Sequence, residues 1–119
     1  MDKEIEAFLE LKNLVEKMNF EIPCIIVEGR KDKEAMEKIG YKGKVFYANA
    51  FKKAKSKIVI LTDFDEEGKE IAKRITKTLG EKNVDKYFRE EFGRILKSIG
   101  RNNIQAISNL CKKYEKFLH

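Results

Sequence analysis

The sequence predicts an α/β fold in which a mostly parallel sheet of three or four strands is flanked by helices. Two short apolar runs, 24–27 and 58–61, have the Ile and Val content of strands that are buried on both faces. Segments with apolar residues at helical spacing lie before, between and after these runs. Such an alternation of strand and helix patterns is typical of βαβ units, which place their strands side by side in a parallel sheet.

The first half of the chain contains two expected helices and two expected strands. Residues 3–18 carry apolar side chains at helical spacing, and charged residues occupy the other face of this extra N-terminal helix. The first strand, 24–27, follows Pro23, which is tolerated at the start of a strand. A second amphipathic helix is expected over 32–39, and a second strand over 44–48.

The second half predicts a further strand and more helices. In chain order, we expect a helical turn over 50–55, a strand from Lys57, a helix over 67–79, a short edge strand near 83–84 and a helix over 85–100. Asn102 and Gln105 resemble a capping box that starts a last, C-terminal helix.

We expect the 119 residues to form one domain, because a chain of this length holds one hydrophobic core and not two. No apolar stretch approaches the roughly 20 residues that span a bilayer, and the N-terminus lacks the pattern of a signal peptide. A soluble, cytoplasmic protein with no membrane partner is therefore expected. Cys24 and Cys111 are far apart in sequence, so we expect buried, reduced thiols rather than zinc ligands. The charged fraction of 39%, dominated by Lys and Glu, is compatible with adaptation to high temperature.

Three carboxylates follow the two apolar runs. Glu28 comes directly after the first run, and Asp63 and Asp65 come shortly after the second. Because the carboxyl ends of neighbouring parallel strands share one edge, where ligands bind, we expect these three side chains to meet. Gathered carboxylates repel one another unless a divalent cation lies among them, and oxygen ligands of this kind suit Mg²⁺ or Mn²⁺. Asp63 and Asp65 would face one ion together if the strand continued through Phe64, which would then point into the core.

Two sequence motifs contain these acids. The first, Glu28-Gly29-Arg30-Lys31-Asp32, and the second, Asp63-Phe64-Asp65-Glu66-Glu67-Gly68, resemble the signature motifs of the Toprim domain. This domain is found in type IA and type II topoisomerases, bacterial primases, overcoming-lysogenization-type nucleases and the ribonucleases that mature small ribosomal RNA. The resemblance spans about residues 22–80. It implies a Rossmann-like Toprim core over about 22–84, followed by a C-terminal helical extension over about 85–118.

The resemblance also implies roles for individual residues. In Toprim enzymes the Glu that matches Glu28 is thought to act as a general acid or base, and the Asp pair that matches Asp63 and Asp65 is thought to bind the metal. The motif positions that would support or cap the site are Gly29, Asp32 and Gly68. Taken alone, Asp32 can equally be a helix cap, because acids after strands commonly cap the following helix.

A basic segment lies between the two motifs. From residue 38 to residue 62 there is no acid, and aromatic residues are interspersed with the lysines. A one-sided segment of this kind beside an acidic edge indicates a site that binds a polyanion, although lysines on a solvated face would give the same pattern. The basic residues that we expect to bind nucleic acid are Arg30, Lys31, Lys42, Lys44, Lys52, Lys53, Lys55, Lys57, Lys69, Lys73 and Arg74.

Three functions from different classes are compatible with these features. The first is metal-dependent phosphodiester chemistry on RNA or DNA, as a nuclease or phosphotransferase, with RNA maturation as one setting. The second is a non-catalytic nucleic-acid-binding module, or an accessory subunit that works with a protein partner. The third, a receiver-like signalling domain, is disfavoured because its acid pair follows the first strand, whereas here the pair follows a later one. Topoisomerase activity is not expected, because these residues leave no room for a strand-passage domain.

Overall fold

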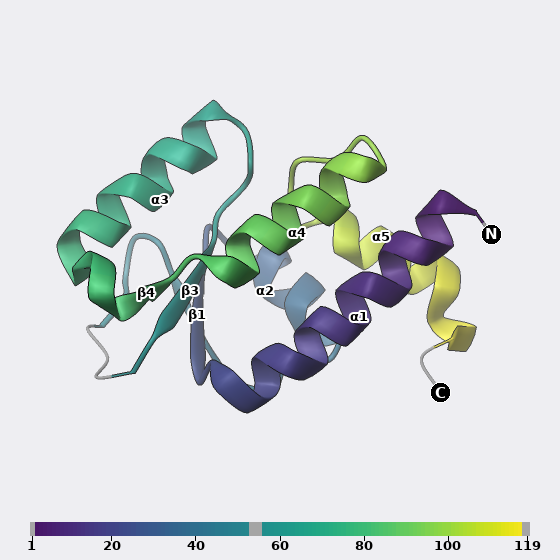
Figure 1. Cartoon of the computed structure of the whole chain (residues 1–119), viewed down its shortest axis with the longest axis horizontal. Helices are drawn as coiled ribbons and strands as arrows, with labels where there is room; N and C mark the ends of the chain where they lie inside the picture. Colours follow the sequence, from purple (N-terminus) through teal and green to yellow (C-terminus); the bar gives the residue numbers. More distant parts are fainter. Residues whose placement is uncertain (1, 53–55, 118–119) are drawn as a thin grey trace.

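The computed structural model describes residues 2–52 and 56–117, and a parallel sheet lies at its centre (Figure 1). The four strands are β1 (Cys24–Val27), β2 (Lys44–Tyr47), β3 (Ile58–Leu61) and β4 (Val84–Asp85). They lie in the order β2-β1-β3-β4, and each neighbouring pair is parallel. The predicted α/β fold is therefore confirmed, and the weakly signalled fourth strand is a two-residue edge strand.

Five α-helices flank the sheet in the described part of the chain. They are α1 (Lys3–Glu21), α2 (Arg30–Lys38), α3 (Glu66–Leu79), α4 (Tyr87–Ser98) and α5 (Ala106–Tyr114), and the 3-10 helices η1 (Glu81–Asn83) and η2 (Glu115–Phe117) follow α3 and α5. Because successive residues of a strand point to opposite faces, Ile25 and Val27 pack against α1, α2, α4 and α5, while Ile26 packs against α3. The helices therefore cover both faces of the sheet (Figure 1).

The larger core lies between the sheet and the four helices on its first face. Phe8 of α1, Phe92 of α4 and Ile107 of α5 are buried there together. Full burial of a side chain of this kind stabilises the fold by roughly 1.5–3 kcal/mol. Helices from both ends of the described chain thus share one core with the sheet.

The strand order creates a crevice at the carboxyl ends of β1 and β3. The chain passes from β1 through α2 to β2 on one side of the sheet, and from β3 through α3 to β4 on the other. β1 and β3 are direct neighbours, with Val27 level with Leu61. The connections therefore leave these two strands in opposite directions, and such a switch point is where open α/β sheets bind ligands.

The start of α2 differs from the prediction. The helix begins at Arg30, so Gly29 is its N-cap, and Asp32 lies in its first turn. The Asp32 side chain nonetheless supports the helix start, because its Oδ2 accepts a 3.1 Å hydrogen bond from the Gly29 N–H. Asp32 therefore supports the helix start as expected, but the N-cap itself is Gly29, three residues earlier.

Two local predictions in the connecting segments do not hold. α5 begins at Ala106, whose N–H donates a 2.9 Å hydrogen bond to the Asn103 side chain, so the capping box of Asn102 and Gln105 is wrong. Residues 50–52 form no helical turn, and 53–55, which include the predicted phosphate-binding Lys53 and Lys55, lie outside the described residues.

Both cysteines are buried, as the sequence predicts. Cys24 and Cys111 are buried free thiols, and burial raises the pKa of both. Thiols of this kind are poor nucleophiles and poor metal ligands. No helix within residues 2–52 and 56–117 is long and apolar enough to cross a membrane.

Candidate functional site

A hydrogen bond joins two of the predicted site residues in the crevice. Glu28 follows β1 directly, and its Oε2 accepts a 2.7 Å hydrogen bond from the backbone N–H of Asp63 beyond β3. Oδ1 of Asp63 in turn accepts a 3.3 Å hydrogen bond from the N–H of Ile104, in the segment before α5. Both carboxylates are half-buried. The structure therefore brings Glu28 and Asp63 together at the switch point, as the strand pattern predicts.

The electrostatic environment of Asp63 favours added positive charge. Burial, and after it the nearby carboxylate of Glu28, raise the pKa of Asp63 to about 6. The Ile104 hydrogen bond acts in the opposite direction, because it favours the ionised carboxylate. A cation placed between Glu28 and Asp63 would relieve this repulsion.

Asp65 has a different local role. β3 ends at Leu61, so Asp63 and Asp65 are not on one continuous strand, and Asp65 is the N-cap of α3. Its Oδ1 accepts a 2.7 Å hydrogen bond from the N–H of Gly68, and the residue is exposed. Asp65 therefore lies at the rim of the crevice, with one carboxylate oxygen engaged by the helix start.

Gly68 allows this tight turn. A β-carbon at Gly68 would overlap the backbone carbonyl of Asp63, so no other residue fits there without moving the turn. The carbonyl of Gly68 accepts a 2.7 Å hydrogen bond from the hydroxyl of Thr62, which is fully buried. The turn that carries Asp63 is thus pinned to the first turn of α3.

Asp32 lies beneath the site. Only 4% of its surface is exposed, and its Oδ1 is buried without a hydrogen-bond partner among the described residues. Burial raises the pKa of Asp32, with a further contribution from the Glu28 carboxylate, whereas the Gly29 N–H lowers it. A buried carboxylate with an orphaned oxygen adds to the negative potential around Glu28.

Arg89 on α4 contacts the end of β3 and the turn that carries Asp63. Its guanidinium donates hydrogen bonds to the carbonyls of Ile60 (3.1 Å), Thr62 (2.8 Å) and Asp63 (3.1 Å). It also lies over the ring of Phe64, 4.7 Å from the centroid, and Phe64 packs against the larger core. Burial lowers the pKa of Arg89, while Glu28 and Asp63 act to raise it. Sequence reasoning missed Arg89, which no motif marks among the apolar positions of α4.

The donor atoms of the crevice fit a hard divalent cation. No group of three or more His, Cys, Asp or Glu side chains is arranged to hold a metal ion in the residues that the structure describes. Glu28 and Asp63 supply carboxylates only, however, and Mg²⁺ commonly binds through one or two carboxylates together with waters and substrate phosphates. Burial, with the neighbouring Glu28 carboxylate adding to it, raises the pKa of Asp63, and a cation at this position would favour its ionised form.

The predicted phosphate-binding residues fall into two groups. Arg30 and Lys31 begin α2 beside Glu28, Lys69 lies in the first turn of α3, and Lys73 and Arg74 lie near the middle of α3; all five are exposed at the surface. Two of them form exposed ion pairs within α3, Lys69 with Glu66 (3.7 Å) and Lys73 with Glu70 (3.6 Å). These residues lie on the two helices that start at the crevice.

A second group lies at the opposite edge of the sheet. Lys44 pairs in register with Cys24, the first residue of β1, and Lys42 and Lys57 precede β2 and β3. The amino and carboxyl ends of a four-residue strand are about 10–13 Å apart. Lys52, which is exposed, follows β2 in the connection towards β3. The described lysines of the acid-free segment are therefore spread over both edges of the sheet and are not gathered beside Glu28.

Comparison with known proteins shows relatives of similar length. The chain is 33% identical to a UPF0292 protein of Thermococcus sibiricus over 94% of both chains. It is 28% identical to a UPF0292 protein of Pyrococcus furiosus, covering 92% of this chain and 88% of that protein. A UPF0292 protein of Archaeoglobus fulgidus is 33% identical over 77% of both chains. These relatives come from archaeal thermophiles, in keeping with the Lys- and Glu-rich composition.

A solved structure shares the fold. A protein from Aquifex aeolicus superposes with a TM-score of 0.60 at 28% sequence identity, covering 85% of this chain and 94% of that chain. The family model of the Toprim domain matches residues 23–88, which are more than half of the chain and include both acidic motifs of the crevice. The chain therefore belongs to the Toprim-domain family.

Proposed function

We propose that this protein catalyses divalent-metal-dependent phosphodiester chemistry on nucleic acid, as a nuclease or another phosphotransferase. The observation that carries the proposal is the 2.7 Å contact between Glu28 and the Asp63 backbone at the switch point of the sheet. Family membership supports a metal-binding role related to nucleic acid. The finer assignment of activity rests on the chemistry of the crevice.

Glu28 is the proposed general acid or base, and Asp63 and Asp65 are the proposed metal ligands, with Glu28 contributing to the same ion. A bound Mg²⁺ or Mn²⁺ would offset the charge of a substrate phosphate and align it for displacement at phosphorus. The Asp63 N–H holds Glu28 by one oxygen, which fixes the carboxylate in the crevice. A fixed carboxylate can accept a proton from an attacking group or return one to a leaving group.

The supporting residues keep these carboxylates in place. Gly29 and Asp32 fix the start of α2 behind Glu28, and Gly68 fixes the start of α3 behind Asp63. The phosphates on either side of the reacting one would contact exposed basic residues. Arg30 and Lys31 begin α2, and Lys69, Lys73 and Arg74 lie on α3; both helices start at the crevice. Lys42, Lys44, Lys52 and Lys57 would contact only a longer substrate.

The test is incubation of structured and unstructured RNAs and DNAs with Mg²⁺ or Mn²⁺, in parallel with the Glu28→Gln variant. We expect cleavage or transfer by the parent and none by Glu28→Gln, because the amide keeps the shape and loses the proton-transfer capacity. Glu37→Gln, near the end of α2, exposed and outside both motifs, is the matched control and should keep activity. Activity that survives Glu28→Gln would contradict the assignment. Binding without any reaction would instead favour the accessory module.

A further inference from the structure

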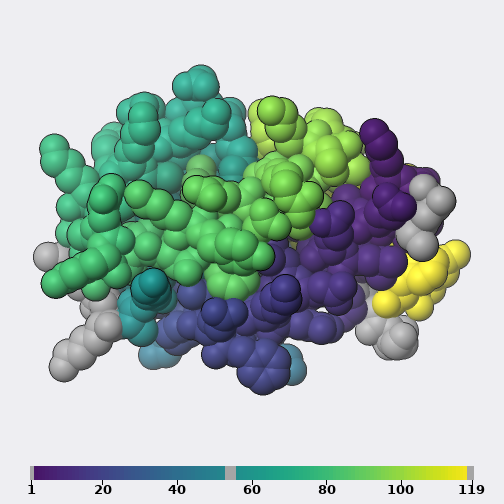
Figure 2. Space-filling view, in the orientation of Figure 1, coloured from purple at the N-terminus to yellow at the C-terminus, as the bar shows by residue number. Residues whose placement is uncertain are grey.

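A groove lies between α3 and α4, next to the crevice. Its volume is about 860 Å³, and we call it the α3–α4 groove. Its floor is apolar, being formed by Ile60, Phe64, Ala72 and Val84, and Gly93 lines it from α4. Figure 2 shows the side chains of α3 and α4 next to each other on this face of the molecule. A volume of this size is typical of a site that binds a small molecule.

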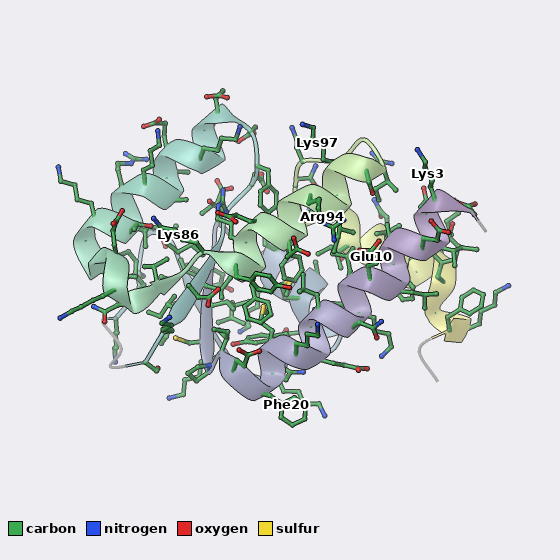
Figure 3. All side chains as sticks on the ribbon, viewed as in Figure 1. Lys3, Glu10, Phe20, Lys86, Arg94 and Lys97 are labelled. Atoms are coloured by element: carbon green, nitrogen blue, oxygen red, sulfur yellow. The ribbon has the colours of Figure 1, made fainter. Side chains whose placement is uncertain are left out.

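The groove adjoins the turn that carries Asp63, although none of the carboxylates Glu28, Asp63 and Asp65 lines it. Phe64, which lines the groove, directly follows Asp63 in the chain. Arg89 lines the groove as well, lies over the Phe64 ring and donates a hydrogen bond to the Asp63 carbonyl. From Phe64 the groove extends along α3 towards Gly80 and Lys86, which is labelled in Figure 3 at the start of α4. A ligand whose reacting group lies at Glu28 and Asp63 would therefore reach the groove past Phe64 and Arg89.

The rim of the groove is electrically balanced. The basic groups are Lys69, Lys73, Lys77, Lys86 and Arg89, and the acidic groups are Glu66, Glu70, Glu81, Asp85 and Glu90. Three of the lysines are already paired with rim acids, at N to O distances of 3.4 to 3.7 Å. A balanced rim gives little attraction for a row of phosphates. An apolar floor with hydrogen-bonding groups around it instead suits a neutral, flat occupant with polar edges.

We propose that the α3–α4 groove binds unpaired nucleobases next to the phosphate held at Glu28 and Asp63, so the preferred substrate is single-stranded nucleic acid. This inference rests on the proposed function and extends it. A nucleobase is neutral and presents an apolar face to the floor, and face contacts of this kind tolerate any base sequence. In a duplex the base faces are stacked and the pairing edges are occupied, so neither is available to the groove.

Two threonines of α3 give a matched pair of variants. Thr76 lines the groove, and Thr78 does not. Each hydroxyl donates a hydrogen bond to the carbonyl four residues earlier, Thr76 to Ala72 (2.8 Å) and Thr78 to Arg74 (3.0 Å). Thr76→Trp fills the groove with a large side chain, whereas Thr78→Trp adds the same side chain to exposed surface. The two substitutions make equal demands on the helix itself.

Affinity is measured by fluorescence anisotropy in EDTA at low salt, with a short single-stranded RNA or DNA, the same strand carrying abasic positions, and the matching duplex. Thr76→Trp should weaken binding of the intact strand by at least about fivefold, because one base contact of this type contributes that factor or more. Thr78→Trp should stay within about twofold of the parent, as for an ordinary surface substitution. The abasic strand should lose affinity for the parent and show little further loss with Thr76→Trp.

Equal effects of the two variants would overturn the inference, and so would a parent that binds no single strand or prefers the duplex. Hydrogen exchange on the unmodified parent decides the case even if Thr76→Trp fails to fold. Bound single strand should protect the amides of 69–77 and 86–93, and absence of protection there would refute the groove as the base site. Unchanged cleavage of single strands by Thr76→Trp would refute the groove and leave the proposed chemistry standing. Binding that depends on the groove, without any cleavage, would refute the proposed chemistry and leave the groove standing as the base site.

Discussion

The backbone N–H of Asp63 donates its hydrogen bond to Oε2 of Glu28 at 2.7 Å, which links the exit of β3 to the exit of β1. The carboxylate proposed for proton transfer therefore also holds the turn that carries the proposed metal ligand. Glutamine offers a carbonyl oxygen at the same place and can accept the same hydrogen bond. Glu28→Gln is thus a substitution that removes charge and keeps the connection between the two strands.

The stability of the metal-free protein should fall as the pH rises from about 4 to about 6. Burial, with the Glu28 charge adding to it, raises the pKa of Asp63 from 3.8 to about 6, so the folded state favours the protonated form. The favourable contribution is complete below the unfolded pKa and is lost as the pH rises through the folded pKa. Asp63→Asn, which mimics the protonated carboxyl group, should unfold at nearly the same temperature as the parent at pH 4 and a few degrees above the parent at pH 7. A pH-independent difference would contradict the raised pKa.

Above pH 6, a divalent cation should restore the stability that the ionisation of Asp63 removes. At a hundredfold excess over its dissociation constant, Mg²⁺ or Mn²⁺ should stabilise the parent by about 2.7 kcal/mol, since it binds the folded state alone. The double variant Asp63→Asn with Asp65→Asn should show no such rise in calorimetry. In the absence of metal the double variant can exceed the parent in stability, because carboxylate repulsion is relieved. If neither Mg²⁺ nor Mn²⁺ raises the stability of the parent, the assignment of the metal site is refuted.

Gly68→Ala should be far more destabilising than Gly29→Ala. A methyl group at Gly68 overlaps the Asp63 carbonyl, so the turn must move, and we expect a loss of at least about 2 kcal/mol in urea unfolding. A β-carbon at Gly29 has no neighbouring atom within 4 Å, and its φ of −153° suits any residue. Gly29→Ala should therefore change stability by less than about 1 kcal/mol. Similar losses for the two variants would show that the turn at Asp63 is looser than described.

The proximity of Glu28 and Asp63 can be predicted from the sequence, because a strand that is buried on both faces must consist almost entirely of apolar residues. β1 and β3 are buried at every residue, so their apolar runs are unbroken and their ends are clear. The acids that follow such runs must emerge at the carboxyl edge of a parallel sheet. The edge strand β2 is exposed or half-buried throughout, and its signal is correspondingly weaker.

The position of Asp65 could not be read from the sequence, because it depends on the length of a distant strand. β4 pairs only with Ile58 and Val59, so the backbone beyond Val59 has no strand partner on that side. The carbonyls of Ile60, Thr62 and Asp63 are satisfied by Arg89 instead. The chain therefore turns after Leu61, and Asp65 becomes a helix cap. The placement of the lysines depends in the same way on strand register, which puts Lys44 level with Cys24.

Arg89 should contribute more to stability than the neighbouring Arg94 on the same helix. Arg89→Met leaves three carbonyls of the site turn without their donor, and we expect a loss of about 2–4 kcal/mol. Arg94 forms exposed ion pairs with Glu10 (3.0 Å, Figure 3) and Glu91 (3.1 Å), so Arg94→Met should cost less than about 1 kcal/mol. Arg89→Lys should restore only part of the loss, because an ammonium cannot reproduce the planar fork of donors. Equal losses in denaturant unfolding for Arg89→Met and Arg94→Met would contradict this role.

The salt dependence of binding should identify which edge of the sheet contacts phosphate. With a few phosphate contacts, the logarithm of the affinity should fall against the logarithm of salt concentration with a slope of roughly −2 to −4. Replacing Lys31 and Arg74 by Gln should flatten this slope by about 1 to 2, because both are exposed on helices that start at the carboxylate crevice and neither belongs to the balanced rim of the groove.

Replacing Lys42 and Lys44 by Gln is the matched control, since these exposed lysines lie at the amino edge of the sheet. That pair should change the slope by less than about 0.5 for a short strand, and by more only when the strand is long enough to reach the far edge. Base sequence should matter little, because phosphate contacts and base faces carry no sequence code. A larger effect of Lys42 and Lys44 on a short strand would place the nucleic acid at the far edge, where neither Glu28 nor Asp63 could act on it.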